Sequence, residues 1–197
     1  MLGKLIDKIM REVYTLGARS DEDRLASAVL LSKQVEGSKI CIPTHLSAFH
    51  PTSMLPIFRR QSTLLRIAHY HALILAHRPF ILYPYPKEPA ERQAVHGHHI
   101  KECIDAAMSA IHAIHAIACG RDRMQFRSLF YVHKVAFVAA SALLVIPVAR
   151  LHQKASPGCK RTHDATDKKA RELVDTAISF LIFGQTRMLR LADTPSS

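Results

Sequence analysis

The segment QSTLLRIAHYHALILAHRPF, residues Gln61 to Phe80, has the apolar periodicity of one long helix. At about 100° per residue, one broad sector of this helix is apolar. That sector holds Leu64, Leu65, Ile67, Ala68, Ala72, Ile74 and Leu75. The opposite sector holds Ser62, Arg66, His69, Tyr70 and His77. The pattern predicts a helix that packs its apolar side against other helices and turns its polar side outward.

His71 is the exception, because it lies within the apolar sector of this helix. A buried imidazole needs a hydrogen-bond partner, so we expect His71 to contact a backbone carbonyl or a carboxylate of another helix. His69 and His71 point roughly 160° apart on a regular helix, which excludes a metal ion held by both. Pro79 is expected to force Arg78 out of the helical conformation and to end the helix there.

Two helices are predicted before this segment. Residues 2–16 have apolar side chains at three- and four-residue spacing, and Gly17 follows as a stop signal. Ser20 is a predicted N-cap for a second helix, which has acidic residues in its first turn and ends at Gly37.

Three further helices are predicted after it. The first begins between Pro89 and His98 and has a continuous apolar stripe, composed of Ile100, Cys103, Ile104, Ala107, Ile111, Ile114 and Ala118. Residues 130–148 are apolar on every side, which predicts a central helix that Pro147 kinks or ends. The last helix spans roughly residues 167–191 and follows a polar, mobile loop.

The fold class predicted from these segments is all-α, a globular bundle of about six helices without a strand. Residues 1–191 are assigned to a single helical domain and residues 192–197 to a disordered tail. A chain of 197 residues can bury a core without disulfides. Its cysteines are dispersed and are expected to be reduced thiols: Cys41, Cys103, Cys119 and Cys159.

Neither membrane insertion nor secretion is predicted. The most apolar segment, SLFYVHKVAFVAASALLVIPVAR, is interrupted by His133 and Lys134. The apolar run after them is shorter than the ~20 residues that a membrane span needs. Residues 1–10 lack the uninterrupted apolar core of a signal peptide. We interpret the apolar segment as a buried core helix.

An all-helical metal-dependent or small-molecule enzyme is the alternative function, suggested by the segment HGHHIKECID. His98 with Glu102, or His99 with Cys103, are four residues apart and could converge on a metal ion. A zinc site usually takes three or four protein ligands, and neither H-E-x-x-H nor paired C-x-x-C occurs. We therefore predict no catalytic residue, no metal site and no cofactor in this chain, and interpret it as a non-enzyme.

The net charge of +11 favours anionic partners. A third hypothesis is therefore direct binding of nucleic acid or of an acidic partner by an acid-free basic cluster, composed of Arg150, Lys154, Lys160 and Arg161. A solvated loop is the more frequent meaning of such a cluster.

The order of several segments resembles a known family. LPIFRRQSTLLRIAHYHALILAHRPFIL is followed by a proline-bearing loop, then CIDAAMSAIHAI, then a charged turn and LFYVHKVAFVAASALLV. This order is similar to the regulatory middle domain of fungal zinc-cluster transcription factors, where a helix ending in His-Arg-Pro-Phe precedes a Cys-containing, alanine-rich helix and a very apolar helix. LGKLIDKIMREVYTL and IPTHL resemble earlier parts of that domain, so the resemblance covers roughly residues 2–151.

The resemblance implies a transcription regulator in the nucleus, with protein partners of a transcription complex and a small-molecule effector. The family's DNA-binding module needs six closely spaced cysteines around two zinc ions, whereas this chain has four dispersed cysteines. Zinc and DNA contacts would therefore belong to a module outside this chain. We expect a fragment without its DNA-binding head, whose exposed apolar faces predict poor solubility or dimerisation.

Five residues are predicted to have structural or ligand-binding roles in such a domain. Phe80 should dock into the core, and Arg78 should pair with an acid of another helix such as Asp105. Any ligand pocket would be apolar and interhelical, with His71 as its buried polar group. Pro79 completes the set as the residue that ends the helix.

Overall fold

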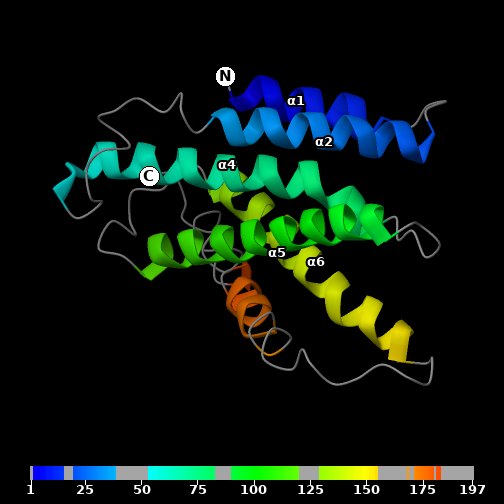
Figure 1. Cartoon of the computed structure of the whole chain (residues 1–197). Coiled ribbons are helices and arrows are strands. Elements are labelled where there is room, and N and C mark those ends of the chain that lie inside the picture. The colour runs from blue at the N-terminus through cyan, green and yellow to red at the C-terminus, as the bar shows by residue number, and fades with distance from the viewer. Residues whose placement is uncertain are drawn as a thin grey trace.

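The computed structural model describes residues 2–15, 20–38, 53–82, 90–119, 129–154, 168, 171–179 and 181–182 of the chain. Within these residues the protein has six helices and no strand, so the predicted all-α fold class is confirmed. The helices are α1 (Leu2–Val13), α2 (Asp21–Gly37), α4 (Pro56–Leu82), α5 (Ala90–Cys119), α6 (Leu129–Lys154) and a helical segment at residues 171–179 (Figure 1).

The predicted boundaries of α2 are confirmed. The hydroxyl of Ser20 accepts a hydrogen bond from the backbone N–H of Asp23 at 3.1 Å, which satisfies one free donor of the first turn. The helix ends at Gly37. α5 begins at Ala90, within the interval expected from the sequence. Gly17 lies outside the described residues.

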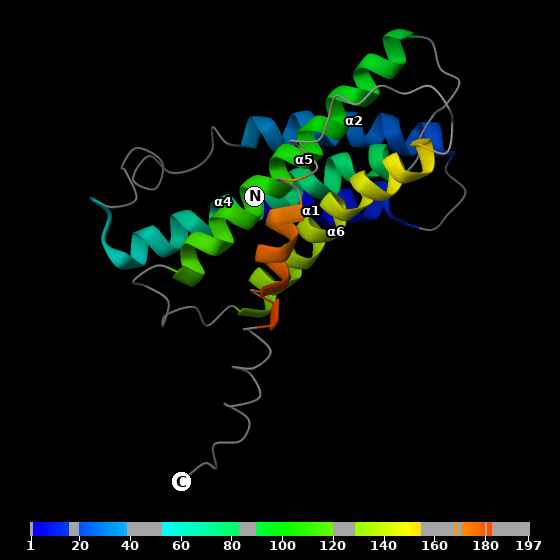
Figure 2. The same ribbon diagram turned by 90° about the horizontal axis from the view of Figure 1, so that it is seen from below.

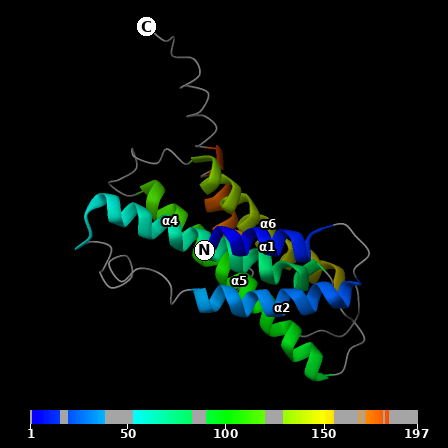
Figure 3. The same ribbon diagram turned by 90° about the horizontal axis from the view of Figure 1, so that it is seen from above.

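α4 is the central helix of the bundle, because it contacts α1, α2, α5 and α6. α1 and α2 lie side by side along one side of α4, and α6 crosses on the other side (Figures 1 and 3). As a result, His69 and His77 are buried, although the helical wheel placed them on an outward side. That prediction is wrong because the second half of α4 has neighbours on every side.

α4 continues through Pro79 to Leu82, so the prediction that Pro79 ends the helix is wrong. Proline has no N–H, and within a helix it leaves the carbonyl four residues earlier without its usual donor. That carbonyl belongs to Leu75, and the hydroxyl of Tyr14 donates to it at 2.8 Å. The residue after α1 therefore supplies the hydrogen bond that the proline removes from α4.

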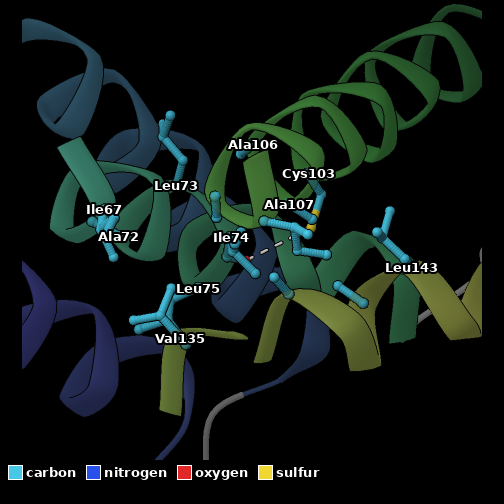
Figure 4. Close-up of a cluster of buried hydrophobic side chains, with 14 of the residues drawn as sticks. Ile67, Ala72, Leu73, Ile74, Leu75, Cys103, Ala106, Ala107, Val135 and Leu143 are labelled. Carbon is cyan, nitrogen blue, oxygen red and sulfur yellow. Dashed lines mark hydrogen bonds between the residues drawn. The ribbon is translucent and has the colours of Figure 1, made fainter. Parts of the chain in front are cut away.

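Buried apolar side chains of α4, α5 and α6 pack together in one cluster. Figure 4 shows Cys103 and Ala107 of α5 beside Ile74 of α4, with Val135 and Leu143 of α6 nearby. The apolar stripe predicted for α5 is buried at Cys103, Ala107, Ile111 and Ile114, and Ile100 and Ile104 are partly buried. These residues belong to one core cluster shared by all the helices.

α6 extends through Pro147 to Lys154, so Pro147 does not end the helix, and the alternative of a kink stays a prediction. It also lies at the outside of the bundle rather than at its centre (Figure 2), and Phe130 and Phe137 are 77% and 64% exposed. None of the helices in the described ranges has both the length and the apolar character of a membrane span.

The predicted last helix is described only at residues 168, 171–179 and 181–182. Leu173, Val174 and Ala177 of this segment are buried in the common core, whereas Ile178 is 43% exposed. Residues 192–197 and most of the preceding polar loop lie outside the described residues. Among the cysteines, Cys103 is a buried free thiol.

Candidate functional site

A pair of histidines bridges α4 and α5 inside the core. Nδ1 of His77 lies 2.9 Å from Nδ1 of His99, and the two residues are 1% and 7% exposed. One ring must donate from a protonated Nδ1 while the other accepts through an unprotonated Nδ1. The hydrogen bond therefore exists only while at least one of the two imidazoles is neutral.

Phe80 fixes the position of the His99 ring. The two rings are stacked, with centroids 4.2 Å apart and an interplanar angle of 19°. His96 approaches Phe80 edge-on at 5.7 Å, from the same helix as His99. Phe80 is 4% exposed, so its predicted docking into the core is confirmed.

Burial keeps both bridging imidazoles uncharged near neutral pH. It lowers the pKa of His77 to about 4, and the neighbouring His99 and His98 lower it further. The pKa of His99 is lowered by burial first, and then by His98, His96 and Lys33. Nε2 of His77 has no hydrogen-bond partner among the described residues. The bridge is thus a neutral polar contact in an apolar interface.

A second bridge joins α4 to α6 through His71. This residue is 2% exposed, as predicted, and its Nδ1 lies 3.3 Å from the hydroxyl of Tyr131. The partner is a hydroxyl rather than the carbonyl or carboxylate expected from the sequence. Burial and then the nearby Lys134 lower the pKa of His71 to about 4, and burial raises the pKa of Tyr131 to about 12. At neutral pH both groups are therefore uncharged.

Among the described residues, Arg78 forms no ion pair with Asp105, the acid that the sequence suggested as its partner. Asp105 is exposed on α5, whereas Arg78 is half-buried and close enough to Cys103 to act on its thiol. The prediction is wrong because α4 stays helical at Arg78, which keeps this side chain beside the buried Cys103 rather than the solvent side of α5.

The four residues of the metal-site hypothesis do not form one cluster. His98 is exposed and Glu102 half-buried, while His99 pairs with His77. Sγ of Cys103 lies 3.8 Å from the carbonyl oxygen of Ile74, the contact drawn in Figure 4. Within the described part of the chain, no three His, Cys, Asp or Glu side chains could hold a metal ion.

Cys103 is a protonated thiol in this environment. Burial raises its pKa to about 12, and the positive charge of Arg78 only partly offsets that effect. Because the thiolate is the reactive form of cysteine, this residue has the properties of a structural cysteine rather than of a nucleophile.

The basic cluster of the third hypothesis is divided between two parts of the chain. Arg150 and Lys154 belong to the last turns of α6, which extends further than the sequence predicted. Lys160 and Arg161 lie outside the described residues.

The sequence did not predict the bridging contacts of three residues: His77, which was placed on an outward side, His99, which was considered as a metal ligand, and Tyr131. A signal for His99 exists, since it precedes Cys103 by four residues and extends the apolar stripe of α5 toward its beginning. No comparable signal exists for Tyr131, because its pairing with His71 depends on how α6 crosses α4.

Comparison of the chain with protein-family models, with curated proteins and with solved structures found no match. What the described residues define is therefore an all-α domain in which two imidazole hydrogen bonds connect the central helix to its neighbours.

Proposed function

We propose that the chain is a regulatory helical domain of a transcription factor, of the kind found in the middle of fungal zinc-cluster proteins. It would act in the nucleus through protein partners of a transcription complex and through an effector that changes helix packing. Zinc and base-specific DNA contacts would belong to a separate DNA-binding module. No catalytic step is assigned to these residues.

The joint packing of α4, α5 and α6 is the observation that supports this proposal. These helices contain the segments on which the resemblance rests. The His-Arg-Pro-Phe sequence lies in the last turns of α4, where Phe80 stacks on His99 of α5. The Cys of the alanine-rich helix, Cys103, contacts the carbonyl of Ile74 in α4. The segments whose order in the sequence resembles that of the family therefore also contact one another in the fold.

α4 is the element through which an effector would act in such a domain. His71 connects it to α6, and His77 connects it to α5. A neutral hydrogen bond contributes only about 1 kcal/mol net. An effector with a modest preference for one helix arrangement could therefore shift the packing of α4 against both neighbours.

Sequencing of the complete transcript tests the assignment to the family. A six-cysteine cluster in frame with these residues is the expected result. An open reading frame that encodes no such cluster would count against a zinc-cluster transcription factor.

A tethering experiment tests the regulatory role independently of the family. Residues 1–197 are fused to a DNA-binding domain of known site, and transcription of a reporter carrying that site is measured. We expect a several-fold change that Phe80→Ala abolishes by disrupting the core, with Leu30→Ala on the exposed side of α2 as the matched control. An unchanged reporter with a fusion that accumulates normally would argue against the role.

A further inference from the structure

Between Phe130 and Leu144, the outward side of α6 exposes large apolar side chains. Phe130, Phe137 and Leu144 are spaced by seven residues and are 77%, 64% and 47% exposed. At 100° per residue they lie, with Lys134 and Ser141, within an arc of about 80°. We call this set of five residues the α6 outer face. The opposite side of the helix is buried in the core, through Val132, Val135, Ala136, Ala139 and Leu143.

The solvent-exposed side of the neighbouring α5 provides a comparison for the α6 outer face. Between residues 98 and 115 the exposed positions of α5 are polar and include His98, Lys101, Asp105 and His112, whereas Val95 near its start is an exposed apolar residue. The α6 outer face, by contrast, exposes three large apolar side chains to solvent. A seven-residue apolar repeat is the spacing by which one helix contacts another.

Charge indicates which kind of helix fits this surface. The sequence of α6 contains Lys134, Arg150 and Lys154 but no Asp or Glu, and the whole chain carries a net charge of +11. Lys134 itself lies on the α6 outer face and is exposed. A second copy of this chain would bring the same positive charge, whereas an acidic helix would be attracted.

The area of this face indicates how strong a contact it can make. A large aromatic side chain can bury roughly 150–250 Å². From their exposed fractions, the three apolar residues offer on the order of 300–400 Å² on each partner, below the ~1,200–2,000 Å² in total that stable complexes bury. The surface has the size for a weak contact with a single helix.

We propose that the α6 outer face is a docking surface for an acidic amphipathic helix of a partner protein. The apolar side of that helix would cover Phe130, Phe137 and Leu144, and one of its carboxylates would pair with Lys134. The inference rests on α6 alone and does not require the regulatory role proposed above.

The test uses the full chain and a labelled helical peptide of about 18 residues, long enough to cover Phe130 to Leu144. The peptide has Leu at seven-residue and three- or four-residue spacing and Glu at the outward positions, and binding is measured by fluorescence anisotropy. We expect a dissociation constant of roughly 10–100 µM. Phe137→Glu should weaken binding by about tenfold or more, and Lys134→Glu by several-fold.

Leu30→Glu is the matched control, because Leu30 is 63% exposed on α2 and lies away from the α6 outer face. It should leave the dissociation constant unchanged, and circular dichroism should show the same helical content for all variants. A peptide of identical composition with scattered leucines should not bind.

Three results would overturn the proposal. The first is undetectable binding of the acidic peptide at about 1 mM, well above the expected constant. The second is equal binding of a version with Lys in place of Glu. The third is dimerisation in analytical ultracentrifugation that Phe137→Glu abolishes and the acidic peptide does not inhibit, which would make a second copy the occupant. None of these measurements has a transcriptional readout, so the docking surface can fail without the regulatory role.

Discussion

α4 and α6 both depart from the usual distribution of polar and apolar side chains, but in opposite ways. α4 buries His71 and His77, which are 2% and 1% exposed, whereas α6 exposes Phe130 and Phe137. Apolar residues are expected inside and histidines are usually only partly buried. The difference shows that the neighbours of a helix, more than its own periodicity, determine which of its sides are exposed to solvent. α4 is surrounded by four helices, and α6 is covered on one side only.

Acid should destabilise the fold through the buried imidazoles, which is the largest effect we expect from this comparison. Between pH 7 and pH 4, the free energy of unfolding should fall by roughly 3 kcal/mol for each of His71 and His77. The folded-state pKa values of about 4 lie below the unfolded value of 6.5. The stabilisation is therefore complete above pH 6.5 and is lost as the pH falls toward 4, and His99 adds to the same trend. Urea denaturation at a series of pH values measures it.

Carboxylates also titrate between pH 7 and pH 4, so variants are needed to show that the loss of stability comes from the buried histidines. His77→Gln is neutral at every pH and can still hydrogen-bond to His99, and it should reduce the slope by about 1.4 kcal/mol per pH unit. His112→Gln on the exposed side of α5 is the matched control, because it removes a histidine outside the buried bridges. Equal slopes for the wild type and His77→Gln would contradict a cost of protonating the buried bridge.

Replacement of phenylalanine by alanine should destabilise the fold much more in α4 than on the α6 outer face. Phe80→Ala removes a ring that is 4% exposed and stacked on His99, so we expect a loss of about 3–5 kcal/mol. Phe137→Ala removes a ring that is 64% exposed, so the change should be within about 0.5 kcal/mol. Urea midpoints at pH 7 give both values. Similar losses at the two positions would mean that the α6 outer face is covered within the chain itself.

Most of the helical framework could be predicted from the sequence, because the signals involved are local. Ser20 caps α2 through a contact three residues away, and the stripe of α5 requires only the spacing of its own residues. The continuation of α4 through Pro79 could not be predicted in this way. Its missing donor is replaced by Tyr14, which is 61 residues from Leu75 in the sequence.

In the candidate site, too, burial could be predicted from nearby residues of the sequence, whereas partners on other helices could not. The burial of His71 followed from its apolar neighbours on the wheel, but its partner Tyr131 is 60 residues away. His77 was predicted to face outward because nothing in the sequence of α4 shows how many helices surround it. The distance between His77 and His99 depends on the register of α4 against α5, which neither helix specifies alone.

A smaller loss than that of Phe80→Ala is expected for the hydrogen bond that replaces the one missing at Pro79. Tyr14→Phe leaves the Leu75 carbonyl without the hydroxyl of Tyr14, so we expect a loss of about 1–2 kcal/mol in the free energy of unfolding. In the background of Pro79→Ala, residue 79 has an N–H and can donate to the same carbonyl within α4. There the cost of Tyr14→Phe should fall below about 0.5 kcal/mol.

A double-mutant cycle with these two substitutions isolates the coupling between α1 and the proline of α4. Both variants keep the ring of residue 14, so the packing of Tyr14 against the core is retained and only the hydroxyl is tested. Equal costs of Tyr14→Phe in the two backgrounds would show that the hydroxyl does not compensate for the proline. A coupling of about 1 kcal/mol would show that α4 remains helical through Pro79 partly because a residue 65 positions earlier in the sequence, Tyr14, supplies the donor that α4 itself lacks.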